Sequence, residues 1–150
     1  MSTQTHLERA ESLLARWCDS KINPQPNRID IELDASEVIP VVATLVDGQW
    51  GYLIAITGLD PGIDSGELWV LYHFAEGAAI VTLRVVIPRD QPHIPTIRHL
   101  IALAGIYEQE LSEVLGVTID GTEKSGRLFL ADDWPEASYP LRKDFQPAGD

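Results

Sequence analysis

Acidic side chains are the most concentrated chemically capable groups in this 150-residue chain, and the densest helical set is Glu108, Glu110 and Glu113. Two carboxylates act as general acid and base only if both reach one reacting atom. On a helical wheel, Glu108 and Glu110 border an apolar stripe on opposite sides, whereas Gln109 and Glu113 point away from it. This geometry argues against an acid–base pair. It predicts a solvated helix face or, alternatively, the rim of an interface.

The other reactive residue types lack the spacing of a metal or phosphate site. No HxH or HxxxH pattern connects the four histidines, at positions 6, 73, 93 and 99. His73 lies in an apolar run, where a hydrogen-bonded core or interface residue is expected. The glycines at 58, 62 and 66 are not followed by the Lys-Ser pair of a phosphate loop. The single cysteine, Cys18, excludes an internal disulfide and a cysteine-ligated iron–sulfur or zinc centre. We therefore expect no catalytic, cofactor-binding or metal-binding residue.

Composition limits the class of partner. The chain is 45% hydrophobic, as expected of one globular domain, and its formal net charge is −12. That charge repels phosphate groups, so direct binding to nucleic acid or to an anionic membrane is not expected. No apolar run approaches the roughly 20 residues that span a bilayer, and the N-terminal segment does not resemble a signal peptide. We expect a cytoplasmic protein that reaches a membrane only through a partner.

Hydrophobic periodicity predicts a single α+β domain with a central, mostly antiparallel sheet and flanking helices. Helices are predicted at residues 7–17, 37–46, 96–104 and 106–115, and strands at 27–33, 50–57, 67–75 and 78–87. Ser36 is the expected cap of the second helix, and Gly116 ends the last one. Residues 23–27 are predicted to be a rigid connector, and the strand at 78–87 a half-solvated antiparallel strand after a Glu76-Gly77 turn.

The end of the chain has a different character. From Gly121 to Phe145 it shows little periodicity, yet it carries large apolar side chains and charges of both signs. An extended segment of this kind is expected to lie against its own domain or against another subunit. We therefore divide the chain into an α+β domain, residues 1–131, and an extended C-terminal docking tail, residues 132–150.

Several segments resemble the 30-kDa subunit family of respiratory complex I, the NADH-quinone oxidoreductase. Residues 107–117 are a predicted helix followed by Gly116 and Val117. They are similar to the family's Glu-Arg-Glu helix and to the glycine and hydrophobic residue that follow it. The similarity continues through Asp120-Gly121, Arg127-Leu128-Phe129-Leu130, Asp132-Asp133-Trp134 and Pro140-Leu141-Arg142-Lys143-Asp144-Phe145. Upstream, Leu71-Tyr72-His73, Ile87-Pro88-Arg89-Asp90 and Ile94-Pro95-Thr96-Ile97 are similar to its central hairpin and linker. The resemblance covers roughly residues 28–145 and is most specific in the tail.

The resemblance implies a cofactor-free structural subunit of the hydrophilic arm of the complex. Such subunits dock beside the large, hydrogenase-like subunit near the quinone site, close to iron–sulfur subunits. In this chain the tail would then adhere to the neighbour, with Trp134, Leu141 and Phe145 as anchors and Arg142 and Lys143 paired to partner acids or carbonyls. The full set of expected partner-interface residues is Glu108, Glu110, Arg127, Trp134, Leu141, Arg142, Lys143 and Phe145.

The chain departs from the family pattern at two places. Gln109 stands where the family has the arginine of Glu-Arg-Glu, and residues 121–127 lack the His, the Pro and the first Arg of the family's Gly-His-Pro-x-Leu-Arg-Arg segment. Three hypotheses follow. The first is a subunit of a complex-I-type NADH:quinone oxidoreductase, which we adopt. The second is the equivalent subunit of a membrane-bound nickel–iron hydrogenase or formate hydrogenlyase. The third is a stand-alone enzyme or ligand-binding protein that uses the hairpin face and Asp60.

Overall fold

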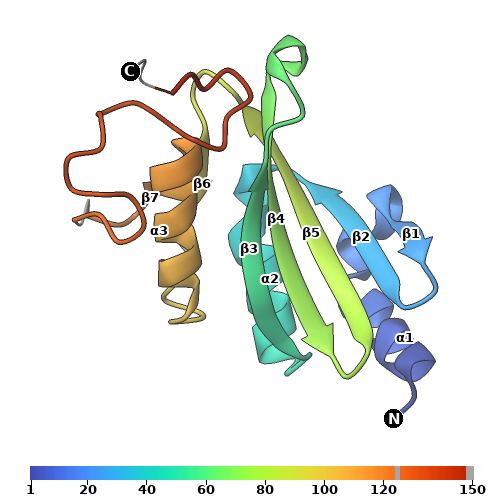
Figure 1. Cartoon of the computed structure of the whole chain (residues 1–150). Helices are drawn as coiled ribbons and strands as arrows, with labels where there is room; N and C mark the ends of the chain where they lie inside the picture. The colour runs from blue at the N-terminus through green and yellow to red at the C-terminus, as the bar shows by residue number, and fades with distance from the viewer. Residues whose placement is uncertain (124–125, 148–150) are drawn as a thin grey trace.

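A computed structural model describes residues 1–123 and 126–147, and it is built around a five-stranded sheet (Figure 1). Lys124 and Ser125 of the diverged loop, and the last three residues of the tail, lie outside the described residues. The strands are β1 (Ile22–Gln25), β2 (Arg28–Leu33), β3 (Tyr52–Leu59), β4 (Glu67–Glu76) and β5 (Ala79–Pro88), in the order β1-β2-β5-β4-β3. All neighbours are antiparallel except β2 and β5. The predicted α+β class is confirmed.

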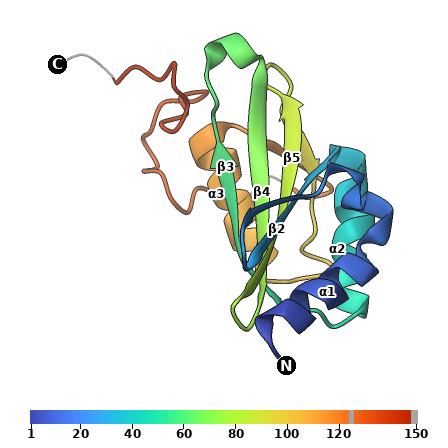
Figure 2. The same cartoon turned by 90° about the vertical axis from the view of Figure 1, so that its right-hand side faces the viewer.

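Helices and a small second sheet complete the fold. The elements are α1 (Thr3–Leu13), α2 (Val38–Asp47), α3 (Ala104–Leu115), the 3-10 helices η1 (Ala15–Ser20), η2 (Ala35–Glu37) and η3 (Ile63–Ser65), and the parallel pair β6 (His93–Pro95) and β7 (Thr118–Asp120). Helices α1 and α2 lie on one side of the main sheet (Figure 2). The core forms there because alternate strand residues, such as Val70, Tyr72 and Phe74 of β4, point toward those helices.

The predicted hairpin is confirmed, since β4 and β5 pair along their length with Gly77 and Ala78 between them. The predicted alternation of β5 is confirmed, since Val81, Leu83, Val85 and Ile87 are buried and Arg84 is partly exposed, but two details need a correction. This strand is central, with β4 antiparallel on one side and β2 parallel on the other, and Thr82 is fully buried. The predicted connector at 23–27 was also wrong. Residues 22–25 form edge strand β1, where Pro24 is tolerated because an edge position leaves one side of the backbone unpaired.

In the N-terminal part of the chain, the boundaries of two helices differ from the prediction. Helix α1 ends at Leu13 and the chain continues as η1, so Trp17 lies in a 3-10 turn. Helix α2 begins at Val38 after η2, and no side chain caps it, so the capping role predicted for Ser36 was wrong. Pro40 does lie in the first turn of α2, where its missing N–H leaves no hydrogen bond unmade.

The predicted helix at 96–104 was wrong, and a buried carboxylate explains the difference. The N–H of Ile97 donates to Glu108 Oε1 at 2.7 Å and the hydroxyl of Thr96 to Glu108 Oε2 at 2.7 Å. These groups therefore hydrogen-bond across to α3 instead of within a helix of their own. Helix α3 is confirmed, and Gly116 ends it with a left-handed backbone (φ +74°) as predicted.

Helix α3 extends the core beyond the edge of the sheet by packing on β3. The contact depends on Gly58, because a Cβ there would lie 2.3 Å from Leu115 Cδ1 and 2.8 Å from Leu111 Cδ2. The phenol of Tyr107 donates to the carbonyl of Ile54 at 2.7 Å, further along the same strand. The missing side chain at position 58 thus sets how closely α3 approaches the sheet.

We expect Gly58→Val to destabilise the domain by about 1–3 kcal/mol, because the added methyl groups overpack the contact with α3. The measurement is the free energy of unfolding in urea. Gly105→Ala is the matched control, since its Cβ would lie an ordinary 3.6 Å from Arg98 Cδ and alanine favours a helix. Equal stability of Gly58→Val and the wild type would contradict this account of the packing.

Candidate functional site

The C-terminal arm, as we call residues 126–147, contains no helix or strand, and its path begins at a carboxylate of α3. Glu113 accepts hydrogen bonds from the N–H groups of Leu128, Phe129 and Leu130 at 3.0–3.1 Å. The amide of Gln109 donates to it at 3.0 Å. Burial raises the pKa of Glu113, but these hydrogen bonds together outweigh burial and leave the pKa lower than usual. A charged carboxylate therefore fixes the start of the arm.

The solvated helix face predicted around Glu108, Glu110 and Glu113 was wrong for two of the three. Glu113 is 8% exposed and Glu108 is 2% exposed, and both serve as internal hydrogen-bond acceptors. Burial raises the pKa of Glu108, partly offset by the bonds from Ile97 and Thr96. Glu110 is half-buried. The wheel carried no information about Thr96 and Ile97, which donate to Glu108, or about the arm, whose N–H groups donate to Glu113.

Further along the arm, the Arg127 guanidinium forms hydrogen bonds with several backbone carbonyls. Its Nη1 donates to the carbonyls of Ala131 at 2.8 Å, Asp132 and Trp134. The indole of Trp134 then donates to the carbonyl of Ser138 at 2.8 Å and its ring stacks on Phe145, with centroids 6.0 Å apart. Arg127, Trp134 and Phe145, three of the expected interface residues, thus have contacts within the arm itself.

The arm also closes the C-terminal end of α3. The N–H of Leu141 donates to the carbonyl of Val114 at 3.0 Å, and Arg142 Nε donates to the carbonyl of Leu115 at 2.7 Å. These are carbonyls that a helix end leaves without intrahelical partners, and a cation is favourable there. Tyr139 lies against Gly116, where a Cβ would be 2.5 Å from the ring, and the Arg142 guanidinium lies 4.9 Å from the centroid of Tyr139.

A second carboxylate anchors the far end of the arm. Asp60, 5% exposed in the loop after β3, accepts hydrogen bonds from the guanidinium of Arg89, the N–H of Gly62 at 2.9 Å and the N–H of Lys143 at 2.7 Å. Arg89 also pairs with Asp144 at 3.0 Å. The bond from Arg89 is the main reason that the pKa of Asp60 lies far below its usual range. Both oxygens of Asp60 are occupied, so it is a structural anchor here and not an available base.

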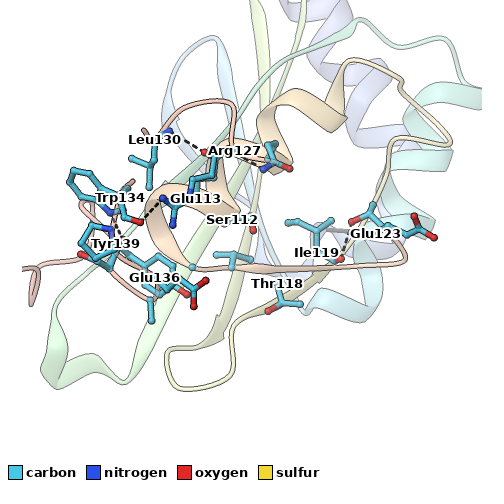
Figure 3. Close-up of a pocket in the computed structure, with 17 residues that line it drawn as sticks. Ser112, Glu113, Thr118, Ile119, Glu123, Arg127, Leu130, Trp134, Glu136 and Tyr139 are labelled. Atoms are coloured by element: carbon cyan, nitrogen blue, oxygen red, sulfur yellow. Dashed lines mark hydrogen bonds between the residues drawn. The ribbon is translucent and has the colours of Figure 1, made fainter. Parts of the chain in front are cut away.

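Between α3, β7 and the arm lies a groove of about 600 Å³ (Figure 3). The charged side chains that line it are Glu113, Glu123, Arg127 and Glu136. Glu113 and Arg127 are already engaged with the arm backbone, and Glu123 and Glu136 are exposed. Among the described residues, no group of three His, Cys, Asp or Glu side chains is placed to hold a metal ion. The groove therefore offers a cavity with negative charge, but its charged side chains do not form a set arranged for a reaction.

The outer surface of the arm carries the residues that remain free for contact. Leu128 is 67% exposed and Leu141 is 57% exposed, Phe129 and Lys143 are also exposed, and only the backbone N–H of Lys143 contacts Asp60. Leu128 and Phe129 were absent from the expected interface set. The apolar run Arg127-Leu128-Phe129-Leu130 in the sequence was the available signal, and it did not reveal which of its side chains face outward.

The described fold and arm match a known family. The family described as "Respiratory-chain NADH dehydrogenase, 30 Kd subunit" matches residues 31–150. Because this match covers most of the chain, the protein belongs to that family.

Curated relatives agree with this assignment. The chain is 33% identical over 113 residues to the NADH-quinone oxidoreductase C/D subunit of Bacteroides thetaiotaomicron, covering 68% of this chain and 21% of that protein. It is 30% identical over 101 residues to the NADH-quinone oxidoreductase C subunit of Chloroherpeton thalassium (65% and 40%). It is also 29% identical over 121 residues to formate hydrogenlyase subunit 5 of Escherichia coli (79% and 21%). The matched region thus spans between about a fifth and two fifths of these relatives.

Solved structures share the fold. A chain of the membrane-bound sulfane sulfur reductase, described as an archaeal respiratory membrane complex, superposes with a TM-score of 0.80 at 22% identity, over 95% of this chain and 86% of that one. A trypsin-resistant fragment of Nqo5 superposes with a TM-score of 0.63 at 20% identity, over 80% and 99%. None of the helices in residues 1–123 and 126–147 combines the length and apolar composition needed to cross a membrane.

We expect Glu113→Ala to release the start of the arm. The substitution leaves three backbone N–H groups without their acceptor, which costs about 1–3 kcal/mol. Hydrogen exchange of the Leu128, Phe129 and Leu130 amides should accelerate by at least tenfold. Glu110→Ala, on the same helix but outside this network, should leave that exchange unchanged. Slow exchange at the three amides in Glu113→Ala would show that Glu113 does not hold the arm.

We expect Asp60→Asn to lower the free energy of unfolding by about 3–5 kcal/mol at neutral pH, because it leaves the Arg89 guanidinium without its charged acceptor. The folded-state pKa of Asp60 lies below the unfolded value of about 3.9, so its stabilisation is complete above that pH and declines as the pH falls further. The difference from wild type should therefore shrink below about pH 4. Urea unfolding at pH 7, 5 and 3 measures it. Asp64→Asn, an exposed carboxylate in the same loop, is the control, and equal losses in both variants would contradict the anchor.

Proposed function

We propose that this chain is a non-catalytic, cofactor-free structural subunit in the hydrophilic arm of a complex-I-type NADH:quinone oxidoreductase. In this proposal it docks on the large, hydrogenase-like subunit near the quinone site and lies close to iron–sulfur subunits. Electrons pass through neighbouring chains, and this chain fixes their geometry. It is located on the cytoplasmic side of the cell membrane and reaches the membrane through the complex.

The observation that carries the proposal is the constrained path of the C-terminal arm. Glu113 fixes one end of the arm and Asp60 the other, yet Leu128, Phe129 and Leu141 remain exposed along it. Exposed apolar side chains on a segment held in one conformation favour contact with another protein, because little conformational entropy is lost on binding. Family membership supports the same role. So does the name that two relatives share, the C/D subunit of NADH-quinone oxidoreductase, in which the matched part is 21% and 20% of the whole.

We revise the expected roles of the interface residues according to the contacts that each makes within the chain. We assign direct partner contact to Leu141, Lys143 and the half-buried Glu110, and add Leu128 and Phe129. Arg127, Trp134, Arg142 and Phe145 support the arm from within, so their part in docking is to shape the surface. Glu108 is directed into the domain and belongs to this supporting group.

The equivalent subunit of a membrane-bound hydrogenase or formate hydrogenlyase is the second candidate. It is favoured by the similarity to formate hydrogenlyase subunit 5 and by Gln109, which replaces the arginine expected in complex I. In the structure Gln109 donates to Glu113 and so takes part in holding the arm. Purification of the tagged chain from native membranes separates the two candidates. Flavin and iron–sulfur subunits identify the first, and a nickel–iron large subunit without a flavin subunit identifies the second.

We expect deletion of residues 132–150 to leave the domain folded and to abolish co-purification of the large subunit. The domain should persist because the core and the Glu113 contacts lie outside the deletion. Wild-type recovery of the large subunit would contradict docking through the arm.

Lys143→Glu should reduce recovery of the large subunit about threefold to tenfold without changing the unfolding midpoint, because its exposed side chain supports no intramolecular contact in the described structure. Arg16→Glu reverses an exposed cation in η1, far from the arm in sequence, and is the control for charge; because Arg16 pairs with Glu37 at 3.9 Å, its unfolding midpoint is measured as well. Equal losses in the two variants would indicate a general effect of charge in place of a specific contact.

A further inference from the structure

Strand β7 pairs with β6 on one side and, among the described residues, has no strand on its other side. The N–H of Thr118 donates to the carbonyl of Pro92 at 2.8 Å. Two residues further on, the carbonyl of Asp120 accepts from the N–H of Thr96 at 2.9 Å. Since alternate residues of a strand direct their backbone groups to opposite sides, the N–H and C=O of Ile119 point away from β6. Ile119 therefore marks the free edge of β7.

This free edge keeps hydrogen-bonding capacity for a third strand. The N–H of Ile119 has no partner in the part of the chain that the structure describes, and its C=O accepts one bond, from the hydroxyl of Thr122 at 3.2 Å. A carbonyl oxygen has a second lone pair to offer. The opposite edge, on β6, is less suited, because Pro95 has no N–H to donate. An extended segment that adds to this small sheet is therefore expected at β7.

The groove described above lies beside the free edge of β7 (Figure 3). Ile119 lines it together with residues of α3 and of the arm, whereas no residue of β6 is among the described lining. Its volume of about 600 Å³ falls within the range of roughly 300–1,000 Å³ that is usual for binding pockets. A segment that pairs with Ile119 can thus place side chains in the groove.

The charge of the groove selects the chemistry of that segment. Glu123 and Glu136 are exposed, and neither has a hydrogen bond or ion pair with another described residue. Arg127, the one cation among the described lining residues, already donates to three carbonyls of the arm. The described lining therefore has two carboxylates without a cation to pair with them. A lysine or arginine side chain from outside complements this charge.

We propose that the free edge of β7 and the groove beside it bind an extended, basic segment of a different protein chain. The segment pairs with Ile119 as a third strand, and its lysine or arginine side chain pairs with Glu123 or Glu136. This inference rests on the proposed function, since it requires a neighbouring chain. A second copy of this chain fits less well, because two molecules that each carry a net charge of −12 repel one another.

Residue-resolved hydrogen exchange of the isolated full chain and of the purified native complex tests the strand pairing without any substitution. We expect the Ile119 amide to exchange at least tenfold more slowly in the complex than in the isolated chain. The Thr118 amide, which is bonded to Pro92 within the chain, is the internal reference and should be slow in both.

The other outcomes of this experiment are distinguishable. An Ile119 amide that exchanges equally fast in a complex containing the large subunit overturns this inference and leaves the proposed function standing. A chain that purifies alone overturns both. A slow Ile119 amide in the isolated chain shows that the edge is covered within the chain and overturns the inference. A particle of two copies with Ile119 protected overturns the choice of a different chain.

A matched pair of double variants tests the charge of the segment. Glu123→Lys combined with Glu136→Lys should reduce recovery of the complex by at least fivefold, because the groove then repels a cation. Asp47→Lys combined with Asp64→Lys makes the same change of charge at exposed carboxylates outside the groove and should not. The unfolding midpoint of each isolated variant separates loss of binding from loss of folding. If the groove variant fails to fold, hydrogen exchange of the wild type still decides. Equal recovery of the two folded variants overturns the basic segment.

Discussion

The arm depends on hydrogen-bond acceptors that it does not itself supply. A segment without helix or strand has backbone N–H groups that must find partners, and buried polar groups rarely remain unpaired. Glu113 accepts three of them and Asp60 accepts that of Lys143 at the other end. Both carboxylates belong to the domain, one on α3 and one after β3. The conformation of the arm is therefore set by the domain on which it lies. These two contacts fix the positions of the arm's exposed residues.

At the C-terminal end of α3, the helix in turn depends on the arm. A helix leaves its last carbonyls unpaired, and here the arm supplies the donors, Leu141 N–H and Arg142 Nε. Gly116 turns the chain away from the helix and leaves the space that Tyr139 fills. Helix α3 and the arm thus stabilise each other, and α3 is in turn joined to β3 through Gly58. A continuous set of contacts thus links the sheet, through α3, to the outer surface of the arm.

Much of this fold could be predicted from local pattern, whereas the arm contacts could not. Alternation identified the hairpin and Gly116 marked the end of α3, because both signals lie within a few neighbouring residues. The failures involve partners distant in sequence. Glu108 is buried because Ile97 and Thr96 need an acceptor, and the same bonds replace the helix predicted at 96–104. Arg142 was expected to meet a partner but closes the helix of its own chain, a role that no local spacing indicates.

The distribution of charge separates surfaces that remain in water from surfaces suited to burial. A net charge of −12 opposes association with any acidic surface, and on the sheet Arg28 and Arg84 are already paired with Asp30 and Glu32. By contrast, the exposed side chains of Leu128, Phe129 and Leu141 give the arm apolar surface that carries no charge. The arm is held in one conformation by Glu113 and Asp60 before any partner arrives. Because the cost of ordering the arm is already met within the chain, contact energy at its exposed residues contributes directly to assembly.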